Sequence, residues 1–144
     1  KDVMHIGYKW INDHRLLRLW QDFVALFYKH LKDTHEIDAF YFDLLEDASL
    51  NWNKQNPKRV ALESYVKLLE HEGRLHSQLE CFFCSKKIDE DISLLRAFLP
   101  AHKECSATSS IKKVAFYELV ENKSTLFLSD EEVDKLWYVL LEGL

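Results

Sequence analysis

The 144-residue sequence predicts a mostly α-helical fold: one helical domain with a small zinc-ribbon-like insertion. It contains only three glycines and two prolines, too few for the many tight turns of a sandwich of short strands. Apolar residues recur at helical spacing in most segments. The helical period is lost only around two closely spaced pairs of metal-ligand residues. With 47% hydrophobic residues, we expect a single domain over 1–144, with the insertion at about 80–106.

The first predicted helix runs from about Asp2 to Leu31, and its apolar residues leave only a narrow polar stripe. They include Leu16, Trp20, Phe23, Val24, Phe27 and Leu31. In the second predicted helix, apolar residues recur at i, i+3, i+4, i+7, i+8 and i+11, and Asp33 or Thr34 can cap its start. They are Ile37, Phe40, Tyr41, Leu44, Leu45 and Ala48.

The third predicted helix has signals at both ends, with Asn56 as N-cap, Pro57 at the first helical position and Gly73 just past the end. From Glu80 to Cys105 the helical period disappears. A charged turn over Lys86–Asp91 and an apolar run over Ile92–Leu99 predict a hairpin-like metal ribbon there.

The segment Thr108–Glu121 fits two structures. Ile111, Val114, Ala115 and Leu119 are typical of a helix, whereas Val114–Val120 can also form a strand.

The last predicted helix starts with a capping box formed by Ser129 and Glu132. Its apolar face comprises Val133, Leu136, Trp137, Leu140, Leu141 and Leu144. We expect this face to close the domain's own core, and recruitment of a partner is the alternative.

Cys81, Cys84, His102 and Cys105 form the pattern Cys-x2-Cys-x17-His-x2-Cys. Two close ligand pairs separated by a loop that can fold back are typical of a tetrahedral Zn²⁺ site. Four protein ligands leave no open position for water, so we expect a structural site. The competing interpretation is three buried thiols and a surface histidine.

Catalytic interpretations are weaker. His102-Lys103-Glu104 has the His-x-Glu form of the zinc deaminases, in which the glutamate transfers protons, but there it precedes a Pro-Cys-x-x-Cys, whereas here it follows the Cys-x-x-Cys. A redox Cys-x-x-Cys is typical of a βαβ context, which is not predicted here. The sequence also has no Gly-rich phosphate loop and no Gly-x-Ser-x-Gly elbow. We therefore expect no enzyme.

The net charge of −5 disfavours binding of nucleic acid through the whole surface. Basic residues outnumber acidic ones only in residues 81–113. The candidate DNA contacts are Arg15, Arg18, Lys29 and Lys32 on the polar stripe, and Lys86, Lys87 and Arg96 in the ribbon, with Lys112 and Lys113 beyond it. The alternative is that these are solvated faces. No aromatic platform is evident among them, so we expect weak binding of single-stranded DNA by residues 1–144 alone.

Three cysteines cannot all pair within one chain, and no apolar run is long enough to cross a membrane. We expect a soluble, cytoplasmic protein with free thiols. Because the chain begins with Lys1 rather than methionine, we also expect it to be a fragment of a longer protein.

The run Leu68-Leu69-Glu70-His71-Glu72-Gly73, followed by Leu79-Glu80-Cys81-Phe82-Phe83-Cys84, resembles the junction in RecO-type recombination mediator proteins. In that family a helix ends in glycine shortly before a Cys-x-x-Cys. The resemblance is specific over Leu68–Cys105 and architectural elsewhere. It implies an oligonucleotide-binding barrel upstream of Lys1. It also implies that the intact protein binds single- and double-stranded DNA, anneals strands, contacts single-strand-binding protein and RecR, and helps load recombinase in DNA repair and recombination.

By the same resemblance, the zinc ligands fall on Cys81, Cys84 and Cys105, and His102 replaces a more usual cysteine. Ser85 replaces the glycine that commonly follows the first pair, and Pro100 and Ala101 occupy the stretch where glycines commonly precede the second pair. The leading function is therefore that of a DNA-repair mediator. The second candidate function is a zinc-stapled protein-interaction module unconnected to DNA, and the third is a zinc enzyme. An upstream barrel and binding of single-stranded DNA distinguish the first function from the second.

Overall fold

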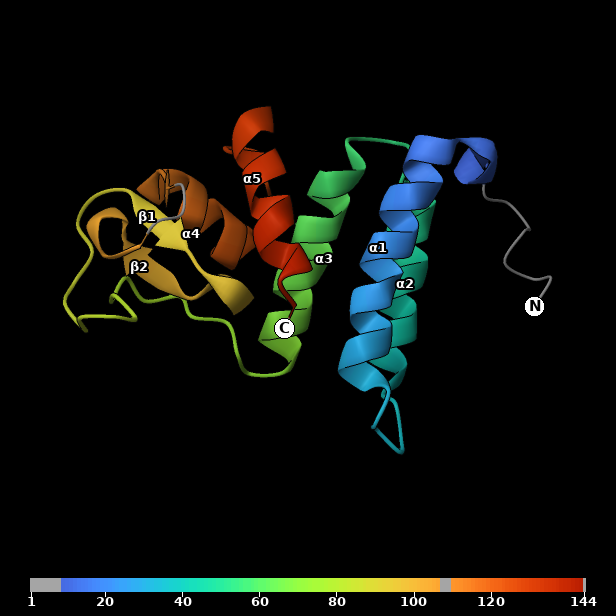
Figure 1. Cartoon of the computed structure of the whole chain (residues 1–144), viewed down its shortest axis with the longest axis horizontal. Helices are drawn as coiled ribbons and strands as arrows, with labels where there is room; N and C mark the ends of the chain where they lie inside the picture. Colours follow the sequence, from blue (N-terminus) through green and yellow to red (C-terminus); the bar gives the residue numbers. More distant parts are fainter. Residues whose placement is uncertain (1–8, 107–109, 144) are drawn as a thin grey trace.

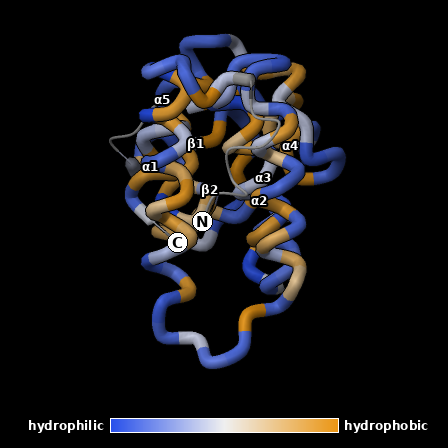
Figure 2. The backbone as a smooth tube through the Cα atoms, turned by 90° about the vertical axis from the view of Figure 1, so that its right-hand side faces the viewer, coloured by the Kyte–Doolittle hydropathy of each residue, from blue (hydrophilic) through white to orange (hydrophobic). Residues whose placement is uncertain are grey.

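The computed structural model describes residues 9–106 and 110–143. The described chain is mostly α-helical, as predicted, with five α-helices and one small three-stranded sheet. Helices α1 and α2 form an antiparallel pair at one end of the long axis, α3 and α5 lie in the middle, and the sheet and α4 lie at the other end (Figure 1). Hydrophilic and hydrophobic residues alternate along the helical parts of the chain (Figure 2), as expected of helices that bury one face. None of the described helices has the length and apolar character needed to cross a membrane.

Helix α1 (His14–Leu31) begins later than predicted. A short 3-10 turn (Lys9–Asn12) precedes it, and Asp13 separates the two with an extended backbone, so one continuous helix from Asp2 is wrong for the described residues. Residues 2–8 of that prediction lie outside the described part of the chain. The Asp13 carboxylate accepts hydrogen bonds from the backbone N–H groups of Arg15 and Leu16, at 3.0 and 3.1 Å. This N-cap satisfies two N–H groups that a new helix leaves free.

Helix α2 (Ala39–Asn51) also begins later than the apolar spacing indicated. Its N-cap is Asp38, whose Oδ1 accepts from the Phe40 N–H at 3.0 Å, so the predicted caps at positions 33 and 34 are wrong. Ile37, assigned to the apolar face, precedes the helix and is 40% exposed. The spacing of apolar residues predicted an additional turn at the start of this helix, but the cap at Asp38 excludes it.

Helix α3 (Pro57–His71) is confirmed with the predicted signals at both ends. The Asn56 side chain accepts from the Lys58 N–H, and Gly73 has a φ of 70° in the left-handed region that glycine favours. The helix is buried along most of its length because it contacts α1, α2, α4 and α5. It is the central element of the domain.

An aromatic cluster joins the 3-10 turn, α1 and the end of α2. Trp52 is fully buried and its ring stacks on Phe23, with centroids 5.5 Å apart. The ring of Trp20 meets it edge-on at 5.1 Å. The Trp52 indole N–H donates to the Leu16 carbonyl at 2.9 Å, and the Trp10 indole N–H donates to the Ser49 carbonyl at 2.8 Å. Both buried indoles therefore satisfy their polar atom.

Helix α5 (Asp130–Leu141) starts at the predicted capping box. Its apolar face packs against α3, which confirms the expectation that this face closes the domain's own core. The buried residues of the face are Val133, Leu136, Trp137 and Leu140. Leu144, the last residue assigned to it, lies outside the described residues.

Two charged side chains of α3 fix the turn that precedes α5. Arg59 donates to the carbonyls of Thr125 and Leu128, at 2.6 and 2.8 Å. Glu63 accepts from both the N–H and the hydroxyl of Thr125, at 3.0 and 2.9 Å. The turn is thereby held rigidly, although Leu126 within it is 71% exposed.

The sheet has the antiparallel order β2-β1-β3, with β1 at Ile92–Leu94, β2 at Pro100–His102 and β3 at Ser110–Ile111. Strands β1 and β2 form the predicted hairpin, but its turn lies within the apolar run and not in the charged segment before it. In this turn Ala97 and Phe98 have φ values of 60° and 55°, a region that non-glycine residues rarely adopt. The buried Phe98 ring packs edge-on against Tyr65 of α3 at 4.8 Å, which offsets the backbone cost.

The ambiguous segment after the ribbon forms β3 and then helix α4 (Lys113–Asn122). The helical alternative is therefore correct, and the strand over Val114–Val120 is wrong. Val114 is 56% exposed, whereas Ala115, Phe116 and Leu119 are buried, which is the pattern of a helix side. Thr108, the first residue of that prediction, lies outside the described residues.

Glu72, the C-cap of α3, connects the end of this helix to the end of α1 and the start of α2. Its Oε2 accepts from the Tyr41 hydroxyl at 2.5 Å and bonds the His30 ring at 2.6 Å, and Arg74 lies 3.4 Å from its Oε1. Burial opposes ionisation of this carboxyl, but the hydrogen bonds from Tyr41 and His30 lower its pKa below the ordinary value. Burial and the Glu72 carboxylate raise the pKa of Tyr41 to about 12.

We expect Glu72→Gln to lower the free energy of unfolding at pH 7 by about 1–3 kcal/mol, because the buried partners lose a charged acceptor. A carboxyl whose pKa is depressed by folding stabilises the protein above its unfolded pKa of about 4.3, and this contribution is lost as the pH falls through the folded pKa. The variant should therefore lose less stability than the wild type as the pH drops below about 5. Urea unfolding at pH 3, 4, 5 and 7 measures this, with the exposed Glu46→Gln as control. Identical acid profiles for wild type and Glu72→Gln would contradict the assignment.

Candidate metal centre

The first ligand pair lies in a tight turn between Leu79 and Ile88, which we call the knuckle. The Cys81 N–H donates to the Lys86 carbonyl and the Ser85 N–H donates to the Cys81 carbonyl, both at 2.8 Å. Ser85 has a φ of 64°, the left-handed conformation that glycine adopts readily. The turn therefore has the geometry of a glycine-containing knuckle although serine stands at this position.

The second ligand pair lies where β2 ends and a 3-10 turn (Lys103–Cys105) begins. His102 is the N-cap of this turn and Cys105 is its last residue, and the turn brings the Cys105 sulfur to 3.8 Å from the His102 Nδ1. The knuckle is joined to β2 by the Phe82 N–H, which donates to the Pro100 carbonyl at 2.9 Å. The His102 N–H lies 3.4 Å from the Cys81 sulfur. The strand thus brings the two pairs together.

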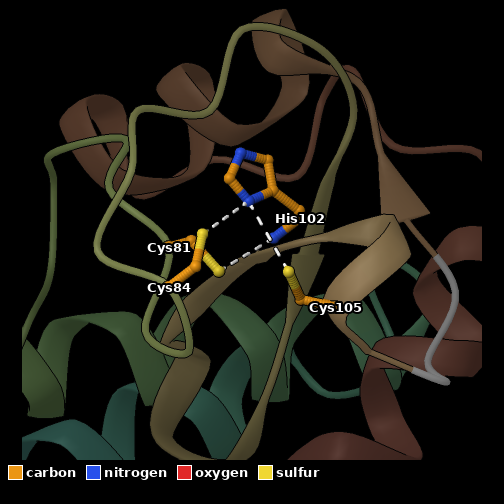
Figure 3. Close-up of side chains that lie close together, drawn as sticks. All are labelled: Cys81, Cys84, His102 and Cys105. Carbon is orange, nitrogen blue, oxygen red and sulfur yellow. Dashed lines mark hydrogen bonds between the residues drawn. The ribbon is translucent and has the colours of Figure 1, made fainter.

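The four predicted ligand side chains converge on one point (Figure 3). The three Sγ atoms and the His102 Nδ1 all lie within 4.8 Å of one another. His102 Nδ1 is 3.3 Å from the Cys84 sulfur and 3.8 Å from the Cys105 sulfur. Neighbouring donor atoms around a tetrahedral Zn²⁺ ion stand roughly 3.5–3.8 Å apart, given its ordinary bond lengths. The cluster can therefore hold a metal ion.

The remaining nitrogen of His102 is held by the backbone of the knuckle. Its Nε2 is 2.9 Å from the Lys87 carbonyl, to which it donates. This hydrogen bond leaves the Nδ1 lone pair facing the three sulfurs, and it fixes both the tautomer and the ring orientation, as is usual around histidine ligands. The same carbonyl, followed by the thiols of Cys81 and Cys84, raises the pKa of the imidazole.

The thiols occupy different environments. Burial opposes ionisation of Cys81, but the backbone N–H groups of His102, Cys84 and Phe83 lower its pKa to about 6. Loss of hydration and the thiols of Cys81 and Cys84 raise the pKa of Cys105 to about 11. Negative charge on the Cys81 and Cys84 sulfurs thus opposes ionisation of the Cys105 thiol. A bound cation would remove this opposition, so the donor set fits a metal ion.

Within residues 9–106 and 110–143, no second group of side chains has metal-ligand geometry. Glu104, on which a catalytic interpretation depended, is exposed and lies outside the cluster. Two other histidines have ordinary structural contacts: His30 bonds Glu72, and His71 pairs with Asp38 at 3.0 Å and stacks on Phe40.

The candidate DNA contacts do not form a single surface. Arg15 and Arg18 lie in the first turns of α1, at the opposite end of the long axis from the knuckle that carries Lys86 and Lys87 (Figure 1). Arg96 and Lys29 both line one cavity of about 270 Å³, which Glu142 also lines. The two phenylalanines between Cys81 and Cys84 are 59% and 57% exposed, which the spacing of apolar residues did not predict.

No protein-family model and no curated protein matches the chain. The function must therefore be inferred from the fold and the site. The structure defines a mostly helical domain with a candidate metal centre of three cysteines and one histidine.

Proposed function

We propose that Cys81, Cys84, His102 and Cys105 bind one structural Zn²⁺ ion. The observation that carries this proposal is the convergence of four donor atoms within 4.8 Å, with the imidazole oriented by a backbone carbonyl. Thiolate and imidazole ligands in tetrahedral geometry favour zinc over magnesium or calcium, which prefer oxygen. Because the protein supplies four ligands, the ion has no open position for substrate, and the centre stabilises the fold without catalysis.

We further propose that the domain belongs to a cytoplasmic RecO-type mediator of DNA repair and recombination. In this proposal the intact protein binds single- and double-stranded DNA, anneals strands, contacts single-strand-binding protein and RecR, and helps load recombinase. Support comes from the order of structural features: α3 ends at His71 and Gly73 follows, the chain crosses to the knuckle, and α5 packs back on α3. The left-handed Ser85 supports it too, since glycine is the more usual residue at that point of the resemblance.

A protein-interaction module unconnected to DNA is the second candidate function. The observation that favours it is the turn held by Arg59 and Glu63, which presents Leu126 and Phe127 to solvent at 71% and 52% exposure. Exposed apolar side chains on a rigid turn are suited to anchoring in a partner.

Strand annealing and zinc content together test the proposed function. We expect about one zinc ion per chain, and annealing of complementary oligonucleotides by the chain extended with any residues encoded before Lys1. Glu104→Gln should change neither zinc content nor annealing, because this exposed side chain is no ligand. His102→Ala should lower zinc affinity, since it removes a donor. Absence of zinc in protein never exposed to chelator would refute the centre, and loss of an activity in Glu104→Gln with zinc retained would indicate catalysis.

A further inference from the structure

Two adjacent phenylalanines project from the knuckle. Phe82 and Phe83 are 59% and 57% exposed, and their ring centroids are 5.7 Å apart at an interplanar angle of 71°. They lie between Cys81 and Cys84, so both of their chain neighbours are candidate metal ligands. Two large aromatic side chains that are adjacent and exposed to solvent are typical of a surface that binds a ligand or a partner.

The backbone that carries these rings is already ordered. The Phe82 N–H is bonded to β2 through the Pro100 carbonyl, and the Ser85 N–H closes the turn on the Cys81 carbonyl. A metal ion held by Cys81 and Cys84 would clamp the turn on both sides of the rings. Little conformational entropy is then lost when a ligand stacks on them.

An open cavity of about 450 Å³ lies beside Phe82, within the usual size range of small-ligand sites. Its apolar walls are Leu75, Leu99 and Pro100, and Ser77, Gln78 and Ser85 supply hydroxyl and amide groups. A flat heteroaromatic ring with hydrogen-bonding edges matches this combination of an aromatic side chain, apolar walls and polar groups better than an aliphatic side chain does.

The charge around the platform is balanced. Lys86 is exposed and forms no ion pair with any residue that the structure describes, whereas Lys87 lies 3.8 Å from Asp89. Glu80 is the only carboxylate among the described residues that line the cavity. One free ammonium group can contact one phosphate, so affinity at this site would come mainly from stacking and only weakly from charge.

We propose that Phe82 and Phe83 form a stacking platform for the bases of single-stranded DNA, with one unstacked base in the adjacent cavity and Lys86 on a neighbouring phosphate. The choice of DNA as ligand rests on the proposed function, and the site itself rests on the exposed rings, the cavity and the lysine. Because the rings belong to the knuckle, the platform depends on the metal centre. Binding of single-stranded DNA should therefore require bound zinc.

The test is fluorescence anisotropy of a labelled thymidine 20-mer with zinc-loaded residues 1–144 at low salt. We expect about tenfold weaker binding for Phe82→Ala and for Phe83→Ala, the size of a lost base-aromatic stack. Phe82→Tyr should bind like the wild type, and Phe82→Leu should not, since leucine keeps the apolar surface but has no π face. The matched control is Phe42→Ala, which removes a phenylalanine that is 63% exposed on α2, outside the knuckle. Zinc content is measured for every variant.

A second measurement locates the contact directly. An oligonucleotide carrying 5-iodouracil should crosslink under near-ultraviolet light to a peptide containing Phe82 or Phe83. Wild-type affinity in Phe82→Leu, a crosslink elsewhere, or no binding by residues 1–144 at low salt would each overturn the platform. Strand annealing by the extended wild type is a separate readout, so the proposed function can stand when the platform fails. An extended wild type that neither binds DNA nor anneals strands would refute both.

Discussion

Replacing Cys84 with alanine is expected to unfold the segment from Leu79 to Cys105 at zinc concentrations that saturate the wild type. Binding of structural zinc is worth on the order of 10 kcal/mol or more in small zinc-binding peptides, and removing one of four ligands forfeits most of it. The Cys84 side chain is exposed, so its loss creates no cavity in the core. The destabilisation would then come from the loss of metal binding and not from a packing defect.

The comparison in chelator makes this test specific. In excess EDTA the wild type and Cys84→Ala should have the same melting temperature, whereas in zinc the wild type should be far more stable. Lys87→Ala is a suitable control, because this neighbouring side chain is exposed and the Lys87 backbone carbonyl that orients His102 is kept. Limited proteolysis with mass mapping reports the unfolded segment. A chelator-insensitive wild type, or a Cys84→Ala protein that holds zinc and resists protease, would contradict the centre.

Unfolding of this segment should reach α3 but spare the aromatic cluster. Phe98 packs on Tyr65, so loss of the ribbon exposes one face of the central helix. Trp52 directly follows α2, and its ring neighbours lie on α1 and on the 3-10 turn before it, at the far end of the long axis (Figure 1). We therefore expect far-UV circular dichroism to retain most of its helical signal in the Cys84 variant.

Elements whose signals lie within a few residues could be predicted from the sequence. Asn56, Pro57 and Gly73 delimit α3, and Ser129 with Glu132 starts α5, because caps act on backbone groups two or three positions away. The metal ligands belong to the same class. They form two local pairs, and a tetrahedral site required only that the chain between the pairs fold back and bring them together.

Two kinds of feature could not be predicted: a cap that interrupts an apolar pattern, and contacts between distant segments. Apolar spacing continues through Asp13, where the carboxylate caps a new helix instead, and local competition of this kind is invisible to periodicity. The hairpin turn at Ala97 and Phe98 lies within an apolar run, because burial of Phe98 on Tyr65 outweighs its backbone preference. The exposure of Phe82 likewise follows from the way that β2 holds the knuckle.

Replacing Trp52 with alanine is expected to lower the free energy of unfolding by about 3–5 kcal/mol, the usual cost of truncating a buried tryptophan. The side chain is fully buried between Trp10, Trp20 and Phe23, and its removal leaves a cavity that three rigid rings cannot fill. This loss is a large part of the total stability of a domain of this size. Trp52→Phe should cost less, because it keeps most of the ring contacts and loses the hydrogen bond to Leu16.

The same variant separates the core from the metal centre. Urea unfolding followed by circular dichroism measures its stability. Leu50→Ala is the matched control, since Leu50 in the last turn of α2 is 52% exposed and should change stability by no more than about 0.5 kcal/mol. At a temperature where Trp52→Ala is folded, zinc content should stay at one ion per chain, because no ligand contacts the aromatic cluster. A loss of stability below about 1 kcal/mol would show that the cluster collapses around the missing ring, and a loss of zinc would show that the two ends of the domain are coupled through α3.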